Sequence, residues 1–321
     1  MKILFIGGTG NISTSVSRLC VAKGWDLWLL NRGGLQSIAG AKSLQADIHS
    51  PAAAAQLAKH EWDVVVNWIA FTTADIERDI NLFKGRTAQY IFISSASAYK
   101  KPGPTPFITE RTPLENPFWE YSRNKIAAEQ RLQREPDFPY TIMRPSHTYR
   151  NTIPIAMGGW TEYTTVDRIK KGLPIVVHGD GTSLWTLTHA DDFAKGFVGL
   201  FGNSKALRDD FHLTSDEFLS WNEIYQLLAS AVGKRADIVH VTSDYICKQD
   251  SRYIGELHGD KSESTLFDNS KIRSLVPDFK ATIPFAEGIK RVVAEFEENP
   301  SRQIISAETN HLIERLISSV K

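Results

Sequence analysis

The first half of the chain alternates short apolar runs with segments of helical spacing, and this alternation constrains the fold more than any other feature. Helices are expected after Gly10, from about Pro51 and over 76–83. Apolar runs without a polar face are typical of parallel strands that helices cover on both sides of a sheet. The pattern therefore predicts an α/β fold with a doubly wound parallel sheet. Its strands are expected at 2–6, 26–30, 43–45, 62–69, 90–93 and 140–143.

The second half is less regular and predicts a smaller, mixed α/β C-terminal lobe. A chain of 321 residues has room for about two domains. We expect the sheet domain to comprise residues 1–150 with 182–212, and the C-terminal lobe to comprise residues 151–181 with 213–321. In this half, strands are expected at 175–177 and 238–241, and helices at 164–171, 192–201, 221–232, 285–296 and beyond Pro300.

The charge balance and the cysteines exclude several classes of protein. The chain has 37 Lys and Arg residues and 37 Asp and Glu residues, so its formal net charge is zero. Nucleic-acid and membrane-surface binders usually carry a basic excess, so neither partner is expected. Cys20 and Cys247 form no zinc or disulfide pattern, and no apolar run reaches the ~18 residues of a membrane span. The apolar start stops at Gly7, too early for a signal peptide, so we expect a cytoplasmic protein without a metal site.

A glycine-rich segment follows the first expected strand and opens the first helix: Gly7-Gly8-Thr9-Gly10-Asn11-Ile12-Ser13. Glycines let the backbone turn tightly and approach a pyrophosphate, and the helix N-terminus adds amide donors and a positive dipole end. An ordinary tight turn between strand and helix is the alternative. Because the segment follows the N-terminal strand, we favour a Rossmann-like dinucleotide site. Its phosphates would lie against Gly7, Gly10, Asn11 and Ile12.

The second strand ends at Asn31-Arg32, where an NAD-selective site usually has an acidic residue for the ribose hydroxyls. Arg32 could instead bind a 2′-phosphate or stack on adenine, or it could be a solvated loop side chain. Asp47, followed by Ile48, could accept a hydrogen bond from the adenine amino group. The expected cofactor is therefore NAD or NADP, with the preference undecided.

Two further motifs carry candidate catalytic groups. Tyr121 and Lys125 are four residues apart on an expected helix, so they share one face. A cation close to the phenol favours its deprotonation, and the lysine has donors for a ribose diol. Ser94-Ser95 follow the strand at 90–93, and active sites of open parallel sheets lie at the carboxyl ends of strands. We expect Ser95 to polarise a substrate oxygen beside Tyr121.

Together these motifs resemble the extended short-chain dehydrogenase/reductases of the NAD-dependent epimerase/dehydratase family, from Met1 to about Phe296. The resemblance implies a Rossmann domain for the dinucleotide and a C-terminal lobe that closes over the substrate. The segments that carry it best are FIGGTGNIS (5–13), FISSASAY (92–99), YSRNK (121–125), MRPSHTY (143–149) and GDGTSLWTLTHADDFAKG (179–196).

The resemblance also implies roles for single residues. Tyr121 would be the acid/base on a substrate hydroxyl, Lys125 would bind the nicotinamide ribose, and Ser95 would hold the reacting oxygen. The further residues that it places along the cofactor are Ile69, Ala70, Phe71, Ser94, Pro145 and Ser146.

Departures from the family's pattern narrow the reaction. Family dehydratases usually carry Thr-Asp-Glu where this chain has Ser95-Ala96-Ser97, which argues against a dehydratase. Sugar-nucleotide epimerases often carry an arginine for the diphosphate in the stretch that here reads Leu184-Trp185-Thr186, which argues against a UDP-sugar. His147 and Arg150 stand where these enzymes often have asparagine and glycine.

We hypothesise that His147 and Arg150 shape a pocket for a phosphorylated or smaller sugar-like ligand. The alternative is a buried structural histidine and a surface arginine. Ser95, Ser97 and Trp185 complete the expected substrate contacts, and the candidates with less weight are Trp160, Lys261 and Lys271.

We therefore expect an NAD(P)-dependent epimerase or oxidoreductase that acts on a secondary alcohol or ketone of a sugar-like substrate. Both reactions would use Ser95, Tyr121 and Lys125, so the sequence leaves the two open. The alternative is a non-catalytic protein, either a dinucleotide-sensing regulator or an RNA binder, because chloroplast RNA-binding relatives carry similar GDGT-containing segments. The expected partner is a small molecule, and a homodimer is left open.

Overall fold

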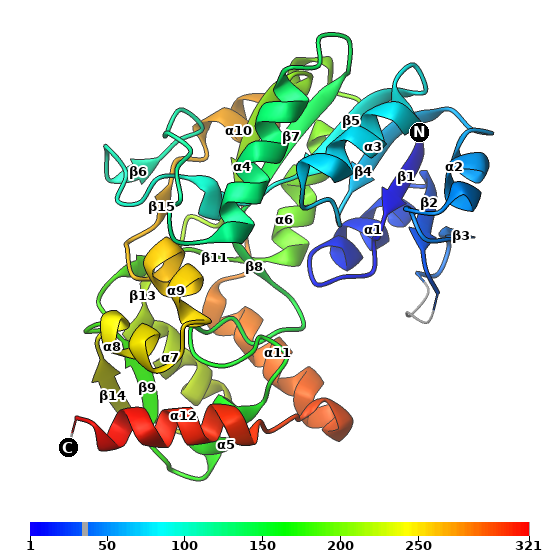
Figure 1. The fold of residues 1–321 in the computed structure, drawn as a ribbon. Coiled ribbons are helices and arrows are strands. Elements are labelled where there is room, and N and C mark those ends of the chain that lie inside the picture. The colour runs from blue at the N-terminus through cyan, green and yellow to red at the C-terminus, as the bar shows by residue number, and fades with distance from the viewer. Residues whose placement is uncertain (34–37, 321) are drawn as a thin grey trace.

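The structure is a computed structural model that describes residues 1–33 and 38–320. Its centre is a seven-stranded sheet in which every neighbouring pair of strands is parallel (Figure 1). In order across the sheet, the strands are β12 (Asp209–Leu213), β7 (Tyr140–Pro145), β5 (Thr87–Ile93), β4 (Trp62–Asn67), β1 (Lys2–Ile6), β2 (Asp26–Asn31) and β3 (Lys42–Gln45). The chain thus winds outward in both directions from β1, and the crevice beyond the carboxyl ends of β1 and β4 is where such sheets bind ligands.

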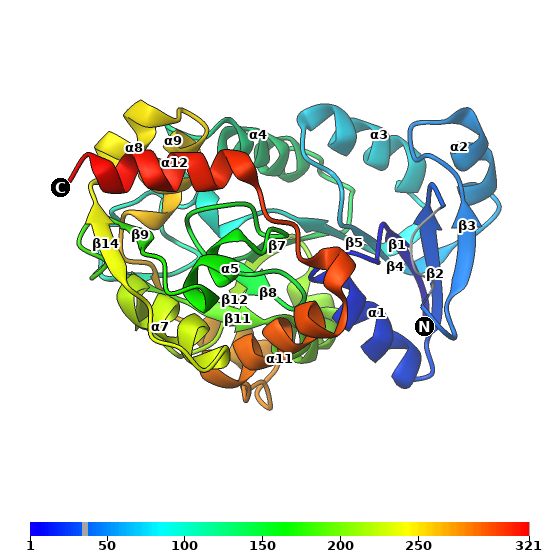
Figure 2. The same ribbon diagram turned by 90° about the horizontal axis from the view of Figure 1, so that it is seen from below.

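Side chains alternate between the two faces of the sheet, which is why its strands are apolar throughout. In β1, Ile3 and Phe5 belong to the core on one face, and Leu4 and Ile6 belong to the core on the other. Helices cover both faces (Figure 2). Those on the first face are α1 (Ser13–Ala22) and α6 (Ala190–Phe197), and those on the second are α2 (Pro51–Leu57), α3 (Thr73–Phe83) and α4 (Glu120–Gln133).

A separate core of buried side chains lies mainly in the C-terminal half, and its largest members are Trp185 and Trp221. None of the helices in the described part of the chain is long and apolar enough to cross a membrane. The helices and strands around this core are α5 (Thr164–Lys170), β9 (Ile175–His178), α7 (Trp221–Ala231), β14 (Ile238–Val241), α8 (Ser243–Gln249), α9 (Tyr253–Glu256), a π-helical turn (Leu257–Lys261), α11 (Phe285–Glu298) and α12 (Ala307–Ser318).

Short strand pairs lie outside the seven-stranded sheet. One of them includes β8, which follows β7 in the chain and borders the crevice. The pairs are β8 (His147–Tyr149) with β11 (Leu187–His189), β10 (Leu184–Trp185) with β13 (Leu219–Ser220), and β6 (Phe107–Ile108) with β15 (Leu266–Phe267).

The predicted fold class is confirmed: a Rossmann-like parallel sheet with a smaller mixed α/β C-terminal part. The strand expected at 62–69 ends earlier, at Asn67, because the Asn67 side chain accepts a hydrogen bond from the Ile69 N–H (2.9 Å) and donates one to Asp79. These bonds turn the chain out of the sheet.

The strand β12 has no counterpart among the strands expected from the sequence. It begins with Asp209 and Asp210 and lies at the edge of the sheet, so its first half is polar. The helix expected at 192–201 begins at Ala190 and ends at Phe197, followed by a short 3₁₀ turn.

The proposed domain boundaries stay a prediction. Helix α10 (Ser270–Leu275) falls in the range assigned to the C-terminal lobe, yet Ile272 and Phe279 pack in the core beside the sheet. Any division of the chain therefore has to interleave its segments.

A buried ion-pair network fastens α4 to the sheet behind the crevice. Arg144 on β7 donates to both carboxylate oxygens of Glu129 on α4, at 2.9 and 2.6 Å, and also pairs with Asp210 on β12. The side chains of Arg144 and Glu129 are 2% and 0% exposed, so neither charge has water as an alternative partner. Removing one partner from such a pair is costly because the other charge stays buried.

We predict that Arg144→Ala lowers the free energy of unfolding by about 3–5 kcal/mol, since it leaves Glu129 buried without its cation. Urea unfolding followed by circular dichroism measures this change. The matched control is Arg131→Ala, which removes an exposed ion pair of the same helix with Glu77 and should cost much less. Equal losses in the two variants would contradict the prediction.

Candidate active site

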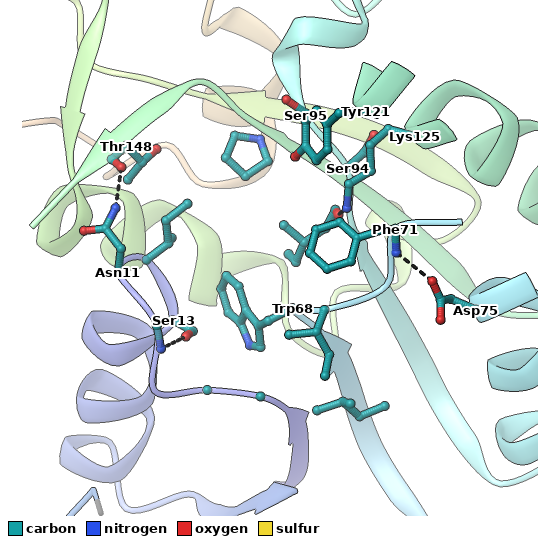
Figure 3. A pocket seen from close by; sticks show the side chains of 18 of the residues that line it. Asn11, Ser13, Trp68, Phe71, Asp75, Ser94, Ser95, Tyr121, Lys125 and Thr148 are labelled. Carbon is teal, nitrogen blue, oxygen red and sulfur yellow. Dashed lines mark hydrogen bonds between the residues drawn. The ribbon is translucent and has the colours of Figure 1, made fainter. Parts of the chain in front are cut away.

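A cavity of about 1320 Å³ opens at the carboxyl ends of the central strands. Pockets for one drug-sized ligand usually measure about 300–1,000 Å³, so this cavity has room for a dinucleotide together with a substrate. It extends from the ends of β1 and β2 past the loops after β4 and β5 to the C-terminal lobe (Figure 3). In residues 1–33 and 38–320, no group of three His, Cys, Asp or Glu side chains could hold a metal ion.

The glycine-rich loop forms one wall of this cavity. Gly7 and Gly8 have positive φ angles of 93° and 107°. A Cβ on Gly8 would lie 2.7 Å from a Leu29 methyl carbon, so only glycine fits there. Helix α1 then begins at Ser13, and no side chain caps its N-terminus. A tight loop followed by uncapped helix amides is the arrangement that binds a pyrophosphate, so these residues fit a dinucleotide.

Asn11 joins this loop to the segment that follows β7. Its side-chain amide donates to the carbonyl of Thr148 at 2.7 Å, and its Oδ1 accepts from the backbone N–H of Arg150 at 2.9 Å (Figure 3). Asn11 and Ile12 both line the cavity, as predicted residues of the phosphate loop. The side chain of Asn11 already has protein partners, so it fixes the loop in addition to bordering the ligand space.

The far end of the cavity is lined by Asn31, Arg32, Asp47 and Ile48, all of which the sequence placed at the adenosine. His49 lies beside them, and its backbone N–H donates to Asp47 Oδ1 at 2.9 Å. Neither an acidic residue at the end of β2 nor a second arginine lines this end among the described residues. The geometry is thus open to either dinucleotide.

The loop after β4 forms the floor. Ile69 and Phe71 line the cavity and are 45% and 46% exposed, which is unusual for side chains of this size. Asp75 holds the loop by accepting the backbone N–H of Phe71 at 2.9 Å (Figure 3). Ala70 does not line the cavity: it is buried, and its carbonyl points at Lys125. The loop thus presents apolar side chains to the cavity and a backbone carbonyl to the buried Lys125.

Lys125 is buried beside this floor. Its Nζ donates to the carbonyls of Ala70 and Ile93 at 2.6 and 2.7 Å and lies 4.5 Å from the centre of the Phe71 ring. Burial lowers the pKa of Lys125 to about 7, although the charges of Asp75 and Glu129 oppose the shift. An ammonium has three donors, so two bonded carbonyls leave one donor for a ligand.

Tyr121 lies one helical turn before Lys125, and its side chain lies beside Ser95 in the cavity (Figure 3). Burial raises the pKa of Tyr121, and the hydroxyl of Ser95 opposes this shift. A nearby ammonium would lower the pKa of the phenol, yet the pKa of Tyr121 is raised because burial is the larger effect. The lysine Nζ lies 5.7 Å from the centre of the tyrosine ring. The phenol thus holds its proton.

Hydroxyl groups continue from Ser95 away from the tyrosine. Ser95 Oγ lies 2.9 Å from Ser97 Oγ, which in turn lies 2.7 Å from Ser122 Oγ. Ser94 points the other way and donates to the buried carboxylate of Glu129. The sequence placed Ser94, Ser95 and Ser97 at the site, and the structure brings all three to the cavity wall.

Pro145 and Ser146, expected along the cofactor, and His147, expected at the substrate, line the cavity. Trp185 is buried behind His147 and donates from its indole Nε1 to His147 Nδ1 at 3.1 Å.

Arg150 does not reach the cavity. Its backbone is held by Asn11, and its guanidinium pairs with Glu295 at 3.6 Å. Lys271 also lies elsewhere, paired with Asp209 at 2.6 Å.

Several lining residues carry no signal in the sequence. Trp68 follows β4 directly, Trp119 lies two residues before Tyr121, and Glu256 and Asp260 belong to the irregular helical stretch of the C-terminal lobe. The proximity of Trp119 to the Tyr-x-x-x-Lys motif is the one local hint. Trp160 and Lys261, both given less weight from the sequence, also line the cavity.

The chain matches the model of the NAD dependent epimerase/dehydratase family over residues 3–212. The chain belongs to this family. The family and its structural neighbours bind NAD.

Two relatives of the chain carry different names, a stem-loop binding protein and a reductase. The chain is 28% identical over 263 residues to the chloroplast stem-loop binding protein of 41 kDa b of Arabidopsis thaliana, covering 74% of this chain but only 65% of that protein. It is 24% identical over 293 residues to the 2'-dehydrokanamycin reductase of Streptomyces kanamyceticus, covering 87% and 80% of the two chains.

Among solved structures, the UDP-glucose 4-epimerase of Bifidobacterium longum, in complex with NAD+ and UDP, superposes with a TM-score of 0.74 at 18% identity. The alignment covers 94% of this chain and 100% of that chain. At this identity the likeness supports the fold and leaves the reaction open.

We predict that Lys125 titrates near pH 7 in the dinucleotide-free protein, since burial destabilises its charged form. The lysine should therefore be neutral above this pH and charged below it. Cε chemical shifts of ¹³C-lysine-labelled protein report the midpoint, and the spectrum of Lys125→Met identifies the signal. A midpoint close to that of ordinary lysines, about 10.4, would contradict the prediction.

Proposed function

We propose that the protein is an NAD(P)-dependent epimerase or oxidoreductase that interconverts a secondary alcohol and its ketone in a sugar-like substrate. The observation that carries the proposal is the convergence of Ser95, Tyr121 and Lys125 on one cavity that also contains the glycine-rich loop. A protein that only binds a dinucleotide has no need of a phenol, a hydroxyl and a buried amine around one point.

Each of the three side chains has a task that its surroundings support. Tyr121 exchanges a proton with the substrate oxygen, and its raised pKa keeps the phenol protonated, which is the form that can donate to a ketone oxygen. Ser95 orients that oxygen by a hydrogen bond, with Ser97 fixing the serine hydroxyl. Lys125 uses its remaining donor on the nicotinamide ribose. When bound, the dinucleotide supplies the hydride chemistry, which no amino-acid side chain provides.

The two reactions differ in what happens after oxidation or reduction. An epimerase keeps its dinucleotide and returns the hydride to the opposite face of the same ketone, whereas a reductase exchanges the dinucleotide at each turnover. Both need the same protein groups, so cofactor retention separates them. Arg32 at the adenosine end can pair with a 2′-phosphate, so the proposal covers NADP as well as NAD. A cytoplasmic location and a homodimer stay predictions.

We predict that Tyr121→Phe reduces turnover of a keto-sugar, followed as the absorbance of the reduced dinucleotide, by about 10²–10⁴-fold. The affinity for dinucleotide should remain, since the phenol hydroxyl does not contact the glycine-rich loop. Fluorescence titration with NADH and NADPH is the control. Retained turnover in the variant would remove Tyr121 from the reaction.

Mass spectrometry of the denatured, purified protein tests the cofactor itself. Tightly held NAD indicates an epimerase, and an empty protein that binds NADPH reversibly indicates a reductase. Failure to bind either dinucleotide in titration would defeat the enzyme proposal.

The likeness to the Arabidopsis stem-loop binding protein supports a second candidate, a non-catalytic RNA binder. RNA affinity through phosphate contacts falls steeply with salt, because binding releases counterions. With a formal net charge of zero, we predict no RNA binding that weakens steadily between about 50 and 200 mM salt. Filter binding with a stem-loop RNA measures it, and a steep salt dependence would favour the binder.

A further inference from the structure

Residues from both halves of the chain build the part of the cavity beyond Tyr121, and we call it the substrate end. Its residues are Trp119, His147, Trp160, Glu256, Asp260 and Lys261. Aromatic side chains thus supply the walls, and a histidine with three charged groups supplies the polar atoms. The inference below rests on the proposed function, because it takes this end to hold the substrate.

The hydrogen bond between Trp185 and His147 fixes the tautomer of the histidine. An indole N–H only donates, so His147 Nδ1, which lies 3.1 Å from Trp185 Nε1, has to be the unprotonated acceptor. The proton of the neutral imidazole is then on Nε2. Trp160 stacks on the same ring with a centroid distance of 4.7 Å and an interplanar angle of 21°, which limits rotation.

His147 Nε2 is buried and has no hydrogen-bond partner among the described residues. A buried donor without an acceptor is costly, and native structures rarely leave one without a functional reason. Burial, together with the nearby charge of Lys261, holds the pKa of His147 well below its usual value. The ring is therefore an uncharged donor without an acceptor, on a residue that lines the cavity, and an oxygen atom of a ligand that reaches Nε2–H would supply the acceptor.

Each charged group of the substrate end is paired with a group of opposite charge. Lys261 is 1% exposed, and its Nζ lies 3.1 Å from Glu256 and 3.9 Å from Asp260. Asp260 also pairs with the buried Lys101. Among the described lysines and arginines that line the cavity, Lys261 alone lies at this end. A diphosphate needs cations that are not already neutralised, and this end supplies none.

We infer that the substrate end binds a compact, uncharged, hydroxyl-rich ring rather than a nucleoside diphosphate sugar, and that His147 Nε2–H donates to one of its oxygens. Trp119 and Trp160 give apolar faces against which the ring can pack, and Trp185 fixes the histidine as a donor. His147 is thus a specificity-determining residue for the proposed reaction.

The tautomer is tested by ¹⁵N NMR of histidine-labelled protein. We expect His147 to carry its proton on Nε2, as the hydrogen bond from Trp185 requires. Spectra of His147→Gln and His147→Asn identify the signal by its absence. A proton on Nδ1 of the neutral ring overturns the inference.

The ligand class is tested by calorimetric titration with UDP and with UDP-glucose. The protein is first saturated with NAD+ or NADP+, whichever binds more tightly, so that UDP can enter only the substrate end. We expect no saturable binding up to about 1 mM of either probe. A Kd below this value overturns the inference while leaving the proposed function intact. Failure to bind any dinucleotide, by contrast, defeats the proposed function, and the tautomer measurement still decides the role of His147.

Discussion

The geometry of the candidate site depends on one buried amine. Lys125 on α4 donates to the carbonyls of Ala70, three residues after β4, and Ile93, the last residue of β5. Burying an amine is unfavourable, and these two bonds and the charges of Asp75 and Glu129 offset only part of the cost, since the pKa of Lys125 is still lowered. A helix fastened in this way cannot slide along the sheet without breaking both bonds. The position of Tyr121, one turn earlier, follows directly.

The network behind the lysine orients the serine pair. Ser94 points to Glu129, whose carboxylate is held by Arg144 from the neighbouring strand. Because successive side chains of an extended segment point to opposite sides, Ser95 is turned toward Tyr121. The Arg144–Glu129 ion pair thus holds helix α4 against the neighbouring strand end. The distance between Ser95 and Tyr121 is therefore set by the buried core.

The sequence predicts the parts of the site that depend on short-range chemistry. Gly8 is required by its close approach to Leu29, the Tyr121–Lys125 spacing follows from the helix, and Ser95 follows from the end of a strand. The roles proposed for these residues stay predictions. The sequence pattern does not predict the parts of the site that form where distant segments of the chain meet. Glu256 and Asp260 reach the cavity only because the C-terminal lobe packs there.

Arg150 shows the same limit in the other direction. It is a candidate for the substrate pocket because it stands where the resembled sugar-nucleotide epimerases often have glycine. The structure turns its side chain toward Glu295, since its backbone N–H is bound by Asn11. A side chain's neighbours in space are set here by one long-range hydrogen bond, which no local spacing reveals.

The two ends of the cavity are therefore under different constraints. The cofactor end is made by the sheet, where a Cβ on Gly8 or a shift of α4 disturbs the core. The substrate end takes Asp260 and Lys261 from a π-helical turn, which is anchored through the carbonyl of Lys261 by Trp221 and His178 at 3.1 and 3.0 Å. Side chains on such a turn can change without disturbing the sheet. Substrate choice can thus vary within this fold while the groups around the reacting oxygen stay fixed.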